Sequence, residues 1–422
     1  MLNYQKIILA NDLPLIMVPM RGVESVTVLV GVGSGSRDES VSKAGLSHFL
    51  EHMAGKGTKK RPTPFEVASV IDSIGGEQNA GTSKEFTEYF AKVASPHLET
   101  AFEFLSDNLK NSIFAPREVE KERRVIVEEI NMYEDLPMRH VLDVSELLLY
   151  GDNALGRDIA GNKKTVAGIG QKDFFDHLSK FYQAQNMVVV VAGKFQKRRA
   201  KRLMKKYFEN FKKGKKPERK KITFVQKEAR IKLVYKKTEQ AHFCLGVQGV
   251  SYSHPDRFTA LIIASILGYS QTSRIYRRIR EEKGWAYYVH TMPEFYTDTG
   301  AIYTQAGVSL DKISESIDLV KKEYFWLTQG KVDDRELKRA KDYLKGRFIL
   351  ALEDSSNVAS RYAIQAVVEN KIRTPDEVLG LIDKVTSNDI LRVSKKIFRS
   401  EKLNLAIIGP YKKSKKFQKL LA

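Results

Sequence analysis

Two segments of the chain share one pattern of polar and apolar residues at an offset of 216 residues. Residues 173–193 read DFFDHLSKFYQAQNMVVVVAG, and residues 389–409 read DILRVSKKIFRSEKLNLAIIG. Each begins with an aspartate that can cap a helix, continues as an amphipathic helix, and ends as an apolar strand followed by glycine. Because the offset is close to half of the 422 residues, the repeat predicts two similar domains of about 210 residues.

A basic segment separates the two expected halves. It reads KKGKKPERKK over residues 212–221 and contains Gly214 and Pro217. Charged residues with glycine and proline, and no large apolar side chain to bury, are typical of a linker. We therefore expect one half over residues 1–211, a linker over 212–221, and a second half over 222–422.

The order of apolar patterns predicts α+β halves, in which helices pack on a sheet. In the first half, strands are expected near residues 4–10, 13–20, 25–33, 76–82 and 86–93, and helices near 43–56, 64–74, 97–111, 117–135 and 139–149. In the second half, strands are expected near 230–237, 242–249, 285–293 and 300–308, and helices near 256–267 and 273–283, before a long helical stretch. Each half then closes with the helix and strand of the repeat.

Composition narrows the class of protein. Cys244 is the single cysteine, so an intramolecular disulfide and a four-cysteine zinc site are excluded. No run of residues approaches the roughly 20 apolar residues that span a bilayer, and the N-terminus lacks the pattern of a signal peptide. We therefore expect a cytoplasmic protein that does not bind a membrane.

The formal charge of +20 raises the question of an acidic partner. A basic surface can attract nucleic acid, anionic lipid or acidic peptides. However, the basic residues lie in short runs along the whole chain, with no motif that combines aromatic and basic residues for RNA binding. We interpret the charge as a solvated lysine-rich surface and expect no nucleic-acid partner. Salt-dependent retention on DNA would identify the alternative.

The stretch GLSHFLEHMAGKGT, residues 45–58, places His48, Glu51 and His52 within five positions. On a helix, side chains three and four residues apart lie on one face, so both imidazoles can reach one metal ion. Glu51 lies beside them and can accept a proton from water. A single histidine on a helix is usually an ordinary polar residue, but three metal-competent groups at this spacing favour a metal site.

A catalytic zinc site needs a third protein ligand and an open position. The segment EVEKERRVIVEEINMYED, residues 118–135, is the best source because it reads as a helix rich in glutamate. Glu122 and Glu129 are seven residues apart and share a face, whereas Glu128 points to another side. The residues alone leave Glu122 and Glu129 as alternatives, and a solvated helix is the simpler interpretation of so many glutamates.

Taken together, these motifs resemble the inverzincin peptidases, which include pitrilysin, insulin-degrading enzyme and the mitochondrial processing peptidases. The order His-x-x-Glu-His followed by ERRVIVEEINM carries the likeness. The likeness continues in the segments GSGSRDE, KGTKKRP, GGEQNAGTSKEFTEYF and ALGRDIAGN, so that it covers nearly the whole chain. The length resembles the bacterial and processing-peptidase branch, whose two related halves enclose a chamber and whose chains pair.

The resemblance implies one Zn²⁺ per chain, held by His48, His52 and Glu129. It implies that Glu51 is the general base and that Glu122 orients a ligand histidine. The expected activity is that of a zinc endopeptidase that hydrolyses extended or unstructured peptides. The alternative within the family is a non-catalytic peptide-binding or assembly subunit, but such chains usually lose the zinc residues.

Two further segments are expected to hold substrate. An extended peptide would add to the sheet edge near Asn79 and Ala80 through backbone hydrogen bonds. In the second half, RRIREEKGWAYYVHT is similar to a family segment whose arginine and tyrosine hold the substrate backbone, and these map to Arg280 and Tyr287. By themselves, the two residues read as a surface ion-pair partner and a strand aromatic. Because one chain carries both the zinc residues and this pair, the resemblance implies a homodimer.

The chain departs from the family pattern in two places. Gly55 stands where the family usually has a bulky aromatic residue, and the glycine-rich run near residues 268–274 is reduced to Gly268. No second His-x-x-Glu-His occurs, and at the offset of 216 its positions hold Ala264, Leu267 and Gly268. If the halves are duplicates, one is therefore expected to carry the chemistry and the other to clamp the substrate.

Overall fold

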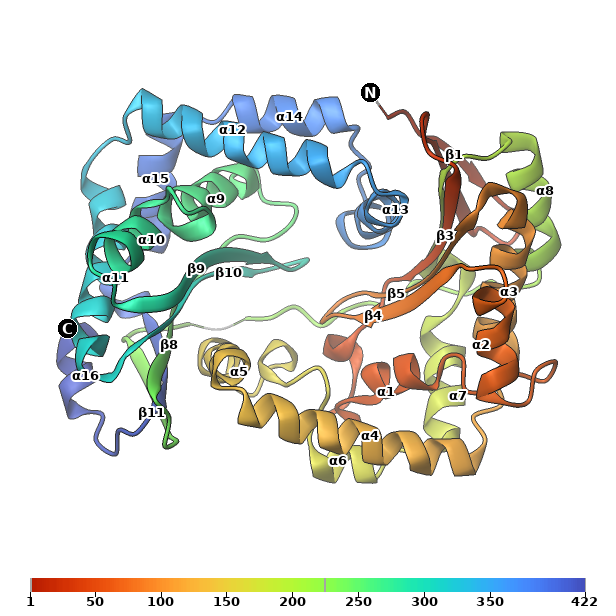
Figure 1. Cartoon of the computed structure of the whole chain (residues 1–422), viewed down its shortest axis with the longest axis horizontal. Coiled ribbons are helices and arrows are strands. Elements are labelled where there is room, and N and C mark those ends of the chain that lie inside the picture. Colours follow the sequence, from red (N-terminus) through yellow and green to blue (C-terminus); the bar gives the residue numbers. More distant parts are fainter. Residues whose placement is uncertain (1, 224, 422) are drawn as a thin grey trace. The chain divides into compact units, whose positions relative to one another are not determined.

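The computed structural model describes residues 2–223 and 225–421, which form two compact units (Figure 1). Each unit contains one β-sheet and helices that pack on it. Unit 1 comprises Met1–Ile130, Asp158–Lys220 and Ile349–Asp376, and unit 2 comprises Asn131–Arg157, Lys221–Phe348 and Glu377–Ala422.

The sheet of unit 1 has the strand order β1-β2-β6-β3-β5-β4. β2 and β6 run parallel, and every other neighbouring pair is antiparallel. The interior strand β6 reads MVVVVAG and is buried throughout, as expected for a strand covered on both faces. The strands are β1 (Gln5–Ile8), β2 (Pro14–Pro19), β3 (Ser25–Val32), β4 (Glu77–Thr82), β5 (Thr87–Ala94) and β6 (Met187–Gly193).

The sheet of unit 2 has the order β7-β11-β8-β10-β9. β7 and β11 run parallel and the remaining pairs are antiparallel, so this sheet matches β2-β6-β3-β5-β4 of unit 1 strand for strand. The shared topology confirms the internal repeat and the α+β class. The strands are β7 (Arg230–Tyr235), β8 (Gln240–Gln248), β9 (Ala286–Phe295), β10 (Gly300–Ser309) and β11 (Asn404–Gly409).

The helices confirm the expected pattern and add three that the sequence did not predict, α6, α8 and α16. The second-half helices expected near 256–267 and 273–283 each continue into a π-helical turn, at Ser265–Tyr269 and Arg277–Glu282. None of the helices among residues 2–223 and 225–421 is both long and apolar enough to cross a membrane.

The helices of unit 1 are α1 (Leu46–Met53), α2 (Pro64–Asp72), α3 (Leu98–Asn111), α6 (Lys163–Ala167), α7 (Gln171–Phe181), α8 (Lys197–Phe208) and α13 (Ser355–Ile364), and α4 (Pro116–Asp135) begins there. Unit 2 contains α5 (Pro137–Tyr150), α9 (Arg257–Ala264), α10 (Arg274–Tyr276), α11 (Ile313–Gln329), α15 (Ser387–Ile397) and α16 (Lys415–Leu421), together with most of α12 (Asp334–Ala351) and α14 (Pro375–Asp383).

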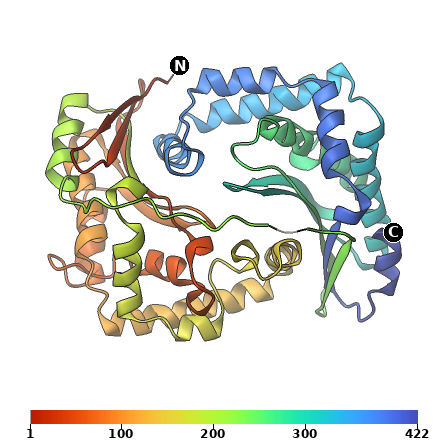
Figure 2. The ribbon, with the colours of Figure 1, turned by 180° about the vertical axis from the view of Figure 1, so that it is seen from behind.

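The two units exchange equivalent helices. α5, from the first half of the chain, packs in unit 2 against β8 and β11, whereas α13, from the second half, packs in unit 1 against β3 and β6 (Figure 1, Figure 2). The compact units are therefore not the contiguous halves 1–211 and 222–422. The division of labour expected for those halves stays a prediction.

The basic segment 212–221 is attached to unit 1 over most of its length. The guanidinium of Arg219 pairs with Asp38 at 2.9 Å and donates to the backbone oxygens of Gly33 and Glu85. The Lys216 ammonium donates to the backbone oxygen of Val367 at 2.8 Å. One of the several places where the chain passes between the units lies between Lys220 and Lys221, within the segment 212–221.

Stability should depend on pH through His177 on α7, which is 5% exposed and packs against Phe181. Burial, with Lys180 adding to it, lowers the pKa of His177 to about 4. Below the ordinary pKa near 6.5 the unfolded chain takes up a proton that the folded chain refuses, so stability falls as pH drops toward 4. At pH 5 this single group should cost about 1–2 kcal/mol.

The melting temperature of the wild-type protein should accordingly fall more between pH 7.5 and pH 5 than that of His177→Leu. Comparing the change with pH, rather than the absolute values, cancels any packing effect of the substitution. Identical changes in both proteins would contradict this assignment.

Candidate metal centre

The short helix α1 begins at a backbone position that requires glycine. Gly45 has φ of +96°, and a Cβ there would lie 2.5 Å from the backbone oxygen of Ala160. The buried carboxylate of Glu39 accepts hydrogen bonds from the backbone N–H groups of Gly45 at 2.8 Å and Ser47 at 2.6 Å. A carboxylate at this end satisfies unpaired N–H groups and complements the helix dipole. Sequence reasoning did not assign this role to Glu39, although an acidic residue shortly before a helix start is a usable signal.

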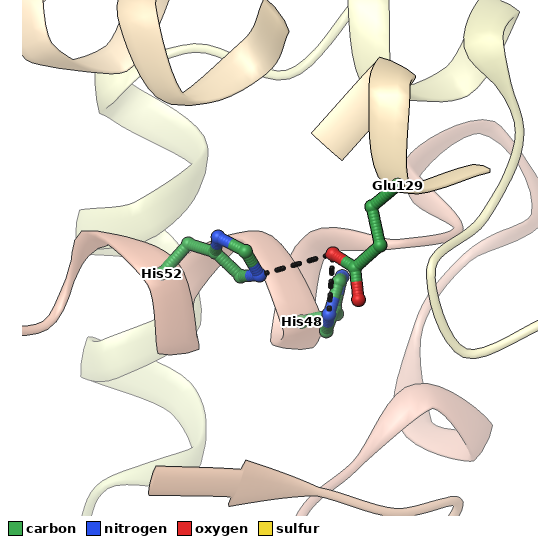
Figure 3. Close-up of side chains that lie close together, drawn as sticks. All are labelled: His48, His52 and Glu129. Carbon is green, nitrogen blue, oxygen red and sulfur yellow. Dashed lines mark ion pairs between the residues drawn. The ribbon is translucent and has the colours of Figure 1, made fainter. Parts of the chain in front are cut away.

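The side chains of His48 and His52 on α1 and Glu129 on α4 converge on one point (Figure 3). The Oε2 atom of Glu129 lies 3.5 Å from Nε2 of His48 and 3.3 Å from Nε2 of His52. Two ligands about 2.0–2.1 Å from a tetrahedral zinc ion are separated by about 3.3 Å. All three ligand atoms lie within 4.8 Å of one another, so the three groups have the chemistry and the approximate spacing to hold one zinc ion.

Glu122, on the same face of α4, approaches the other nitrogen of His52. Its Oε2 atom lies 3.5 Å from Nδ1 of His52, and its Oε1 atom accepts a hydrogen bond from the Lys56 ammonium at 2.7 Å. A proton on Nδ1 directed at this carboxylate leaves Nε2 free to bind a metal. The geometry thus separates two glutamates that the helical spacing alone left as alternatives, and it places Glu128 at the exposed surface.

The two histidines differ in their electrostatics. Burial lowers the pKa of His48, and the neighbouring His52 adds to this effect. Burial also acts to lower the pKa of His52, but the hydrogen bond to Glu129 and the surrounding carboxylates outweigh it, so the net shift is upward. Metal binding requires both rings without a proton on the ligating nitrogen. His52, whose pKa is raised, is the histidine that lies between the two carboxylates of Glu122 and Glu129.

Glu51 extends from α1 into the cavity beside this group. Its Oε2 atom is buried and has no hydrogen-bond partner among the residues that the structure describes. A buried carboxylate oxygen without a partner is costly. Such an atom is suited to accept a hydrogen bond from a water or a substrate that enters the cavity.

The cavity itself measures about 500 Å³ and has Glu51, His52 and Glu122 in its lining. Asn79 and Ala80 of β4 line it as well. β4 is the last strand of the sheet in unit 1 and, within the described residues, pairs only with β5. The structure therefore brings the expected substrate edge together with Glu51 and one candidate metal ligand, His52, at one cavity.

Arg280 and Tyr287 belong to unit 2. Arg280 lies in the π-helical turn that follows α10, and Tyr287 lies at the start of β9. The guanidinium carbon of Arg280 is 5.7 Å from the centre of the Tyr287 ring, and the tyrosine is 73% exposed. The two residues thus form a pair at the surface of unit 2, and their role toward substrate stays a prediction.

The structure also shows what surrounds Gly55 and Gly268, the two positions at which the sequence departs from the family pattern. Gly55, at φ of +87°, lies in the lining of the cavity. Gly268 lies in the π-helical turn after α9, where a Cβ would be 2.3 Å from Oγ1 of Thr291. The first glycine leaves space in the cavity wall, and the second allows close packing against β9.

Comparison with known proteins decides the family. Residues 18–163 match the family model described as insulinase, peptidase family M16, and residues 169–344 match that of the peptidase M16 inactive domain. An uncharacterized zinc protease of Bacillus subtilis is 33% identical over 388 residues, which cover 92% of this chain and 94% of the relative. The chain belongs to peptidase family M16. An uncharacterized zinc protease of Rickettsia felis is 32% identical over 95% of this chain and 96% of its own.

Two solved structures share the fold of this chain. A protease from Helicobacter pylori superposes with a TM-score of 0.90 at 23% identity, covering 97% of this chain and 100% of its own. A Pseudomonas fluorescens structure titled as a peptidase M16 inactive domain gives a TM-score of 0.89 at 16% identity, covering 97% and 99%. The resemblance found in the sequence motifs is therefore confirmed for the family and for the fold.

The choice between the glutamates of α4 can be tested by metal content. We expect Glu129→Gln to weaken zinc binding far more than Glu128→Gln, because only Glu129 faces the two Nε2 atoms of the M16 site. Both variants lose one negative charge on the same helix, so they are matched. Zinc measured by mass spectrometry after dialysis against a weak chelator gives the readout. Equal retention by the two variants would show that Glu129 is not a ligand.

Proposed function

We propose that this M16 protein is a zinc-dependent endopeptidase that hydrolyses extended or unstructured peptides. The observation that carries the proposal is the convergence of Glu129 Oε2 with the Nε2 atoms of His48 and His52, beside an unpaired oxygen of Glu51. These three groups would hold one Zn²⁺ per chain. When bound, the ion supplies a Lewis acid that makes water acidic enough to lose a proton near neutral pH.

In this proposal Glu51 moves the proton. Its carboxylate accepts a proton from water as the water oxygen bonds to the carbonyl carbon of the scissile peptide. The C–N bond then breaks, and Glu51 passes the same proton to the departing nitrogen. Lys56 and Glu122 act before this step, since they hold His52 in the orientation that keeps its Nε2 free.

Substrate would bind as an added strand. Backbone groups of a peptide would pair with the outer edge of β4 at Asn79 and Ala80, a mode that depends on main-chain hydrogen bonds. A peptide must be extended to pair in this way, so unstructured segments are the expected substrates. Arg280 and Tyr287 would hold the peptide backbone from unit 2, and two identical chains would pair.

A non-catalytic peptide-binding subunit of the same family is the second candidate. It would keep the edge strand β4 and the cavity, but it would have no use for a general base. The buried, unpaired oxygen of Glu51 next to the two histidines favours the enzyme. The relatives from Bacillus subtilis and Rickettsia felis are named as zinc proteases, and this also supports the choice.

The general base provides the decisive test. Glutamine keeps the size of Glu51, so Glu51→Gln should retain normal zinc content and normal peptide binding. An amide cannot accept a proton near neutral pH, and general-base contributions are typically 10²–10⁴-fold, so turnover should fall by at least about 10²-fold. Cleavage of a quenched fluorescent peptide measures this, with Glu128→Gln as a charge-matched control that should keep its activity. Near wild-type cleavage by zinc-loaded Glu51→Gln would refute the mechanism.

A further inference from the structure

The cavity beside Glu51 has an apolar wall that contains one unexpected polar group. Helix α3 supplies Phe104, Leu105 and Leu109 to the lining, and all three are buried. Asn108 lies among them on the same helix, lines the same cavity, and is only 8% exposed. Its Oδ1 atom is buried and has no hydrogen-bond partner among the described residues.

Other buried asparagines of unit 1 are better satisfied. Asn11 donates to the backbone oxygens of Phe208 and Phe211 and accepts from the N–H of Leu13. Asn186, whose oxygen is also unpaired, still donates through its amide nitrogen to Phe181. Within residues 2–223 and 225–421, the side chain of Asn108 instead makes no hydrogen bond at all.

An unpaired buried amide needs a physical reason. Leaving a polar group buried without a partner destabilises a fold, whereas leucine has a similar size, suits a helix better and would match the neighbouring wall. The position of Asn108 therefore works against stability of the isolated protein. Because the cavity opens onto Glu51 and His52, a bound substrate is the natural source of the missing partner.

We propose that this cavity receives one substrate side chain next to the scissile bond, and that Asn108 selects a side chain with an apolar body and a polar tip. Tyrosine fits this description better than phenylalanine, since its ring would contact Phe104 and Leu105 while its hydroxyl hydrogen-bonds to the Asn108 amide. The amide offers both a donor and an acceptor, and a hydroxyl can meet either. This proposal rests on the proposed function, because it names a specificity determinant of the same site.

The test uses peptides that differ in one residue. Paired quenched peptides carry tyrosine or phenylalanine on either side of a single cleaved bond, with the bond located by mass spectrometry. At one of the two positions, the zinc-loaded wild-type protein should prefer tyrosine in kcat/KM by about three- to tenfold, the usual worth of a neutral hydrogen bond. Asn108→Leu should abolish or reverse this ratio, while Asn210→Leu, at an exposed position after α8, should keep it.

A second measurement separates this proposal from the chemistry. Binding of the same peptides, labelled with a fluorophore, is followed by anisotropy in zinc-loaded Glu51→Gln and in Glu51→Gln combined with Asn108→Leu. The preference for tyrosine should appear in the first protein and disappear in the second, whether or not the wild-type protein turns over. Asn108→Leu removes no hydrogen bond of the folded chain, so its melting temperature should equal or exceed that of the wild type.

Equal tyrosine-to-phenylalanine ratios with and without Asn108→Leu, at both positions, would overturn the proposal and leave Asn108 as a group that binds only water. Failure of either labelled peptide to bind would overturn it as well. Loss of the preference together with unaltered turnover by Glu51→Gln would uphold the role of Asn108 and refute only the proposed general base.

Discussion

The whole candidate site depends on holding two helices, α1 and α4, at a distance that a single metal ion can bridge. The guanidinium of Arg123 on α4 lies over the ring of Phe49 on α1, 5.6 Å from its centre, and donates to the backbone oxygen of Ile169 at 2.8 Å. Phe49 in turn packs edge-to-face on Phe174 of α7. These contacts help to fix which faces of the two helices meet, and the candidate ligand atoms lie on those faces.

Some polar groups around the candidate site form hydrogen bonds that hold its helices and side chains in place, and others have a buried oxygen without a partner. Glu39 is used at the start of α1, and the pair of Lys56 and Glu122 is used at His52. Glu51 and Asn108, by contrast, each present a buried oxygen without a partner to one cavity. Buried polar groups are almost always paired in folded proteins. The proposals above assign these two oxygens, which face one cavity, to hydrogen bonds with a bound peptide and with the water that attacks it.

The internal repeat accounts for the topology that the two units share, while the residues at equivalent positions differ. The two sheets share one topology, and α5 and α13 are exchanged between the units in equivalent ways. Yet the positions that correspond to His48, Glu51 and His52 hold Ala264, Leu267 and Gly268. In unit 2 these positions are buried, so the same place in the fold serves packing there and carries the candidate metal ligands in unit 1.

The sequence by itself determined most strands and helices and the pair of histidines on one helix face, because these rest on local periods of two or 3.6 residues. The match at an offset of 216 residues determined the repeat, and the order of the patterns determined the class of fold. It did not choose between Glu122 and Glu129, since a spacing of seven residues places both on one face of α4 and does not say which neighbour each meets. The resemblance to a family made that choice, and the structure then showed each glutamate facing a different ring nitrogen of His52. The exchange of α5 and α13, the use of Glu39, and the unpaired amide of Asn108 were decided only by tertiary structure. Each of these depends on which distant segments pack together, and local periodicity carries no information about that.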